Sequence, residues 1–196
     1  MIEWIGLAAG TSFAAGLNLY ATVATLGLLQ RFGVATLPPS LAVLSHPAVI
    51  TVALVLFVVE FVADKIPFFD NVWDAVHTFI RPPAAAILAY AAVAGIDEPW
   101  RVVAALVAGG VALTSHGTKA SARAAVNTSP EPISNGVLSV TEDAIAIGLA
   151  WLAATHPVFT LILTAFLVVA AILALTLIYR LLKRVFGSGP ASRPAT

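Results

Sequence analysis

Long apolar stretches dominate the chain and are interrupted at intervals by short polar or proline-containing segments. Each stretch has about the twenty residues that a helix needs to cross a bilayer at 1.5 Å per residue. The pattern therefore predicts an all-α fold, a polytopic transmembrane helical bundle with about six spans. The predicted spans cover residues 4–29, 47–66, 73–95, 100–123, 133–155 and 157–185.

The connections between these stretches are rich in turn-forming residues, such as Pro38-Pro39 in the first and His156-Pro157 in the fifth. None is long enough to separate two domains, so residues 1–186 are predicted to form a single transmembrane helical domain. Residues 187–196 are rich in Gly, Ser and Pro and are predicted to be a disordered cytoplasmic tail. The only charge before the first stretch is Glu3, which favours a retained helix over a cleaved leader.

The composition supports a lipid environment. The chain is 60% hydrophobic and 10% charged, whereas a soluble domain has about a quarter of its residues charged. A net charge of zero gives no reason to expect nucleic acid as a partner. The absence of cysteine excludes disulfides, thiolate metal sites and a cysteine nucleophile. The expected partners are therefore the lipid bilayer and a small solute or ion, with no cofactor.

Basic residues are distributed unequally between the two sides of the predicted bundle. One side would hold Lys65, Arg81, Lys119, Arg123, Arg180, Lys183, Arg184 and Arg193, and the other only Arg31 and Arg101. Cytoplasmic loops of membrane proteins carry an excess of Lys and Arg. An even number of spans places both termini on the basic side, so both are predicted to be cytoplasmic. The predicted location is the bacterial inner membrane, as a multi-pass protein.

Ionisable residues inside the apolar stretches are the strongest functional signal, because a charge in lipid is costly. Glu60 and Asp64 lie four residues apart, on one helix face. A basic stripe recurs at i, i+3 and i+7, and a carboxylate pair interrupts the fifth span. The stripe is His116, Lys119 and Arg123, and the pair is Glu142-Asp143. These groups are expected to face each other across the bundle interior. The alternative is a set of buried salt bridges that only fixes the bundle.

A second polar pattern occupies residues 70–81, where Asp70, Asp74, His77 and Arg81 share one helix face. The first three are weak candidates for metal ligands. The favoured interpretation is an amphipathic helix at the membrane interface. The sequence leaves open whether Pro82-Pro83 begins or kinks the third span. If the pair marks a kink, Arg81 lies in the membrane as a natural partner for the carboxylates at 142 and 143.

The first span carries Asn18 and Tyr20 near its middle, and Gly6 and Gly10 have the spacing that permits close helix packing. Packing is the favoured interpretation, and a broken helix that lines a cavity is the alternative. The chain also has two candidate internal repeats. One pairs the segments that follow Lys65 and Lys119, and the other is an inverted repeat of three spans and three spans.

Several short motifs stand out along the chain. They are Gly16-Leu17-Asn18-Leu19-Tyr20, Glu60-Phe61-Val62-Ala63-Asp64-Lys65-Ile66-Pro67, Asp70 with Trp73-Asp74, Arg81-Pro82, His116-Gly117-Thr118-Lys119 with Arg123, Pro130-Glu131-Pro132 with Ser134-Asn135, and Ser139 with Glu142-Asp143. Together they resemble a bacterial integral membrane family known as domain of unknown function 4126, over about residues 6–185. The resemblance implies a polytopic membrane protein and no particular activity.

Three functions fit these observations. The first is a small transporter or channel-like permease for a small polar or ionic solute, with a charged intramembrane cavity. That cavity would be lined by Asn18, Tyr20, Glu60, Asp64, Lys65, Arg81, His116, Lys119, Arg123, Glu142 and Asp143. The second is a membrane enzyme or binding protein acting on lipid headgroups, which the lack of a recognisable catalytic motif disfavours. The third is a non-catalytic structural protein that forms a homo-oligomer.

Overall fold

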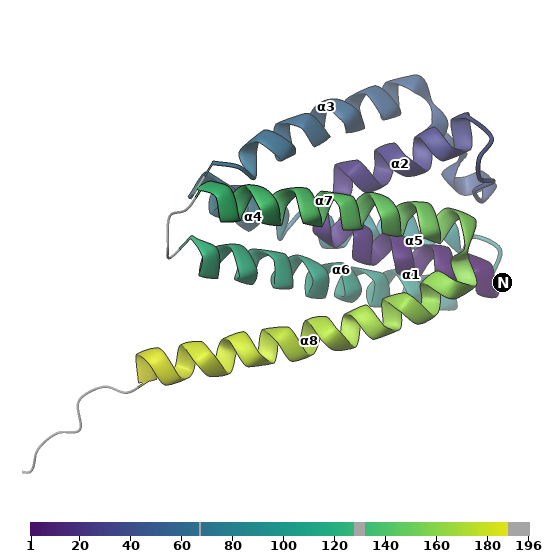
Figure 1. Cartoon of the computed structure of the whole chain (residues 1–196). Coiled ribbons are helices and arrows are strands. Elements are labelled where there is room, and N and C mark those ends of the chain that lie inside the picture. Colours follow the sequence, from purple (N-terminus) through teal and green to yellow (C-terminus); the bar gives the residue numbers. More distant parts are fainter. Residues whose placement is uncertain (67, 128–131, 188–196) are drawn as a thin grey trace, which may run out of the picture.

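A computed structural model of the chain describes residues 1–66, 68–127 and 132–187 (Figure 1). These residues form helices and short connections, and no strand occurs among them, so the predicted all-helical class is confirmed. The helices are α1 (Ile2–Leu17), α2 (Leu19–Arg31), the 3-10 helix η1 (Pro39–Ser45), α3 (Pro47–Ala63), α4 (Phe69–His77), α5 (Arg81–Ala92), α6 (Glu98–Val126), α7 (Pro132–Thr155) and α8 (Pro157–Gly187). Residues 188–196, most of the predicted tail, lie outside the described residues.

The first predicted span is not one helix but a hairpin. Asn18 has an extended backbone (φ −149°, ψ 105°) and separates α1 from α2. Leu7 of α1 and Leu26 of α2 belong to the same buried apolar cluster, so the chain returns to the end of the bundle where it began (Figure 1). At the break, the Asn18 side chain accepts the Ala21 N–H and so caps the first turn of α2.

The third predicted span is also interrupted. Helices α4 and α5 are separated by residues 78–80, and Pro82 and Pro83 lie in the first turn of α5. A proline is tolerated there because the first N–H groups of a helix have no partner within it. The proline pair therefore begins a helix and does not kink one, which answers the question that the sequence left open.

The two ends of the chain lie at opposite ends of the bundle. Figure 1 shows α1 beginning at the end where α3, α6 and α8 also begin, and these three helices run to the far end. The first segment turns back at Asn18, so this arrangement does not match the prediction that both termini share one side, nor the inverted repeat of three spans and three spans.

The two C-terminal helices are the clearest candidates for membrane-spanning segments. Two described segments, Ile133–Thr155 and Pro157–Leu181, are long and apolar enough to cross a membrane. Helices η1 and α3, bent by 65° at their junction, would make a third span if they act together. The predicted count of six continuous spans is not found in the described part of the chain.

The protein has apolar side chains on its surface and charged side chains in its interior, the reverse of a soluble protein. Apolar side chains cover the outer face of α3, where Val52, Val55 and Val58 are each more than half exposed. Charged residues, which are almost never fully buried in soluble proteins, occupy the interior. An apolar exterior of this kind is stable when the surrounding solvent is itself apolar.

Small residues hold the hairpin against its neighbours. A Cβ atom at Gly6 would overlap the carbonyl of Pro157, and one at Gly10 would overlap the side chain of Thr160. The Gly6 and Gly10 pair therefore serves close packing of α1 on α8, as the sequence favoured. The helix break that the alternative included is present as well, at Asn18, further along the same segment.

Candidate functional site

Eleven ionisable side chains from four helices and the end of α3 meet at the level of the hairpin tip. We call them the charge cluster: Glu60, Asp64, Asp70, Asp74, His77, Arg81, His116, Lys119, Arg123, Glu142 and Asp143. None is more than 6% exposed. The structure thus brings together the acidic residues of α3 and α7 and the basic stripe of α6, and it adds the polar face of α4.

Arg81, at the start of α5, connects three elements. Its Nη2 donates to Glu60 Oε1 at 2.6 Å, and its Nη1 donates to the Gly16 carbonyl at 3.1 Å. The same Nη1 lies 2.6 Å from Nδ1 of His116. The partnership of Arg81 with Glu142 or Asp143, expected only if the proline pair marked a kink, does not occur among the described side chains, since α5 begins beside α3 and the hairpin.

Lys119 lies in the middle of the cluster. Its Nζ donates to Asp64 Oδ2 at 2.9 Å and to the Leu17 carbonyl at 3.0 Å, and Glu60 Oε1 is 3.4 Å away. Together with Arg81, it satisfies carbonyl groups at the C-terminal end of α1. Cations are favoured at that end of a helix, because its last carbonyls lack partners and carry the negative end of the helix dipole.

Arg123 joins α6 to α3 and α7. Its Nη2 donates to Asp64 Oδ2 at 2.9 Å, its Nη1 donates to the Asp64 backbone carbonyl at 3.0 Å, and its Nε donates to Glu142 Oε2 at 3.1 Å. Asp64 therefore bridges two cations, Lys119 and Arg123. Buried ion pairs that share partners in this way are costly to break one member at a time.

Helix α4 turns its polar face into the protein. Asp70 and Asp74 are buried, whereas Val72 is 61% and Val76 53% exposed. The amphipathic pattern that the sequence showed is present, but the polar face lies in the protein interior and the apolar face is turned outward. The i, i+4, i+7 spacing identified the shared face. In an apolar environment such a face is more stable when it is buried against charged or polar partners.

The three weak metal candidates have separate partners. Asp70 accepts from Nδ2 of Asn127 at 2.9 Å and from Nδ2 of Asn135 at 3.1 Å. His77 Nε2 lies 3.1 Å from Oη of Tyr20, and its Nδ1 lies 2.8 Å from the Trp73 carbonyl. Within the described ranges, no group of three or more His, Asp or Glu side chains is arranged to hold a metal ion.

Asp143 differs from every other carboxylate of the cluster. Its Oδ1 accepts from Asn18 Nδ2 at 2.8 Å, and its Oδ2 is buried without a hydrogen-bond partner. No ion pair of Asp143 occurs among the described side chains, whereas Glu60, Asp64, Asp70, Asp74 and Glu142 each lie within 4 Å of a cation. A buried carboxylate with one neutral donor is best satisfied when it carries a proton.

Two predicted cavity residues lie at the edge of the cluster. Tyr20 contacts it through His77, and Lys65 donates to the Phe61 carbonyl at 3.0 Å and to Ser139 Oγ at 3.4 Å. Lys65 follows α3 and is partly buried. Burial lowers the pKa of its ammonium group, and the carboxylates of Asp143 and Asp64 oppose that shift.

The sequence analysis missed the amide and hydroxyl groups that complete the cluster. Asn127, Asn135 and Ser139 are all at least nine-tenths buried, and the two asparagines bind Asp70. A signal existed for two of them. Asn135, Ser139, Glu142 and Asp143 recur at i, i+4, i+7 and i+8 and so share one face of α7.

These features define an all-helical protein with an apolar exterior, two interrupted helices and a buried ion network between them. The chain belongs to the family described as domain of unknown function (DUF4126), whose family model matches residues 5–176. The predicted family resemblance is therefore confirmed over nearly the whole described chain. Comparisons with curated proteins and with solved structures found no match.

Proposed function

We propose that the chain is a multi-pass protein of the bacterial inner membrane. Five segments run the length of the bundle, namely α3, the interrupted pair α4 and α5, α6, α7 and α8, while α1 and α2 form a re-entrant hairpin. Lys65 and the basic positions 180, 183 and 184 gather at the end where α8 finishes, against Arg31 and Arg101 at the other. The positive-inside rule then places the C-terminus in the cytoplasm and the N-terminus outside.

We further propose that it is a proton-coupled transporter or permease for a small zwitterionic or anionic solute. One observation carries this proposal: the ends of two interrupted helices meet at a buried charge cluster. Interrupted helices in membranes are tolerated where they line a site, and their free backbone ends bind ions there. Here the last backbone carbonyls of α1 accept hydrogen bonds from the cations Arg81 and Lys119.

The charge balance of the cluster supports coupling to protons. Six carboxylates face three permanent cations, Arg81, Lys119 and Arg123. A charge excess of this size in a low-dielectric interior is expensive unless it is neutralised. The described residues offer no metal-holding group, so bound protons are the simplest neutralising species.

The cluster is closed to solvent in this structure, since its side chains are almost fully buried. Solute entry would require its ion pairs to exchange partners. Asp64, which binds Lys119 and Arg123 at 2.9 Å each, is suited to this exchange because a solute carboxylate could replace it on either cation.

The test is solute-driven proton flux into proteoliposomes that contain a pH-sensitive dye. A panel of amino acids and small organic anions would be added to the wild type, to Asp143→Asn and to the matched control Arg101→Gln, which lies outside the cluster. We expect flux with at least one solute for the wild type and the control, and none for D143N. Absence of flux with every solute would favour the structural role in which the ion pairs only hold the bundle together. Equal flux in the wild type and in D143N would show that Asp143 does not carry the proton.

A further inference from the structure

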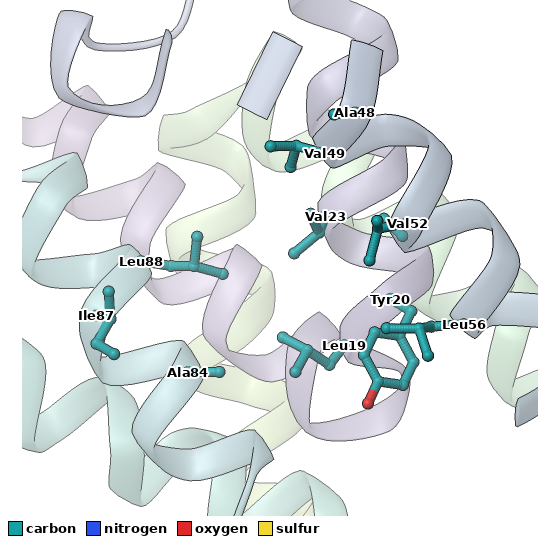
Figure 2. Close-up of a pocket in the computed structure, with 11 residues that line it drawn as sticks. Leu19, Tyr20, Val23, Ala48, Val49, Val52, Leu56, Ala84, Ile87 and Leu88 are labelled. Atoms are coloured by element: carbon teal, nitrogen blue, oxygen red, sulfur yellow. The ribbon is translucent and has the colours of Figure 1, made fainter. Parts of the chain in front are cut away.

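An apolar groove runs along the bundle between α2, α3 and α5, away from the charge cluster (Figure 2). Its volume is about 530 Å³, within the range of small-molecule sites. Figure 2 shows Ala84, Ile87 and Leu88 of α5 across the gap from Val52 and Leu56 of α3. Every lining side chain is aliphatic except Tyr20.

The groove has the shape of a channel for a chain. Its α3 positions recur at i, i+1, i+4, i+5 and i+8, from Ala48 to Leu56, which makes one stripe about 12 Å long at 1.5 Å per residue. At one end stands Tyr20, whose hydroxyl is already engaged 3.1 Å from His77. The walls therefore offer no free polar group to a ligand, only apolar surface.

A positive charge lies beyond the other end of the groove, outside its lining. Arg31 at the end of α2 is exposed, and its Nη1 donates to the Ser45 carbonyl at 3.5 Å, three residues before the lining residue Ala48. A cation at the membrane surface above an apolar channel matches an amphiphile with an anionic head. The groove also opens onto the exposed apolar faces of α3 and α5, where Val52 is 57% and Ile87 70% exposed.

We propose that the groove binds one acyl chain of a membrane phospholipid, with the phosphate near Arg31 and the chain end at Tyr20. This inference rests on the membrane arrangement proposed above and not on transport. The chain would fill the space between α3 and α5 that the protein leaves open, and would bury apolar surface of both helices. Because Tyr20 separates the chain end from His77, the lipid lies beside the charge cluster without entering it.

Native mass spectrometry of the full chain, released from nanodiscs of phosphatidylglycerol and phosphatidylethanolamine, tests this proposal. We expect the wild type to keep one phospholipid after loosely bound lipids have dissociated. Ala84→Phe fills the groove, and Ile87→Trp, at an exposed position that folding tolerates, covers its mouth. Each should lower the retained fraction at least about ten-fold, equivalent to 1.4 kcal/mol of binding.

The matched control is Ala170→Phe on the exposed face of α8, which should retain the lipid as the wild type does. Arg31→Gln should keep the lipid but lose the preference for phosphatidylglycerol. Three outcomes would overturn the proposal. They are no retained lipid on the wild type, retention in both groove variants equal to that of the wild type, or crosslinks from position 87 to a second copy that occupies the groove. None of these bears on proton flux, so the transport proposal stands or falls separately.

Discussion

Replacing each of two adjacent carboxylates on α7 by the corresponding amide is expected to change the stability of the protein by very different amounts. Glu142→Gln and Asp143→Asn each replace a carboxylate by an amide of nearly the same shape. Glu142 accepts from Arg123 Nε at 3.1 Å and lies 3.8 Å from Lys119, whereas Asp143 accepts from the Asn18 amide and has no ion pair among the described side chains. The first change removes a charge that is paired with buried cations, and the second replaces a protonated carboxyl group that has no ion pair among the described side chains.

The expected magnitudes follow from these partners. Breaking a buried ion pair commonly costs about 3–5 kcal/mol. Arg123 keeps Asp64 at 2.9 Å in the E142Q variant, so we expect a loss of about 2–3 kcal/mol in the free energy of unfolding. In D143N the Asn18 bond can still form, because the amide oxygen replaces Oδ1. We expect its stability to stay within about 0.5 kcal/mol of the wild type.

Detergent-driven unfolding of the purified protein, followed by circular dichroism, measures both values under identical conditions. Each variant serves as the control for the other, since both lie on the same helix at the same depth. If D143N lost as much stability as E142Q, Asp143 would be ionised and held by a cation. The assignment of Asp143 as the proton-carrying group would then be wrong, even if transport were observed.

The sequence predicted the helical class and the residues that converge, because both depend on local rules. An apolar stretch must form a helix in lipid, and ionisable groups in such stretches must turn toward one another. Glu60 and Lys119 therefore face each other at 3.4 Å, although they lie 59 residues apart. Which cation pairs with which carboxylate could not be predicted, since that depends on the register between helices.

The two interruptions were harder to predict, for different reasons. An asparagine in an apolar helix can donate and accept within the helix or cap a new one, and Asn18 becomes a cap because Asp143 holds its Nδ2. The position of the cap therefore depends on Asp143 of α7, which lies 125 residues further along the chain. For helix α4 the pattern gives the polar face but not what that face contacts, and here it faces the protein interior while Val72 and Val76 face outward.

Two further predictions test the hairpin. A Cβ atom at Gly16 would overlap Ser115 Oγ and the α6 backbone, so Gly16→Ala should lower the free energy of unfolding by about 2–3 kcal/mol, whereas Gly110→Ala, with open space around it, should not. The chain lacks cysteine, so single cysteines at Glu3 and Arg180 can be labelled with an impermeant maleimide in inside-out and right-side-out vesicles. Because the first segment turns back at its middle and five segments then run the full length of the bundle, the two positions should label from opposite sides. Labelling of both from one side would require α1 and α2 to cross as a single span, which would break the contacts that place Leu7 and Leu26 in one apolar cluster.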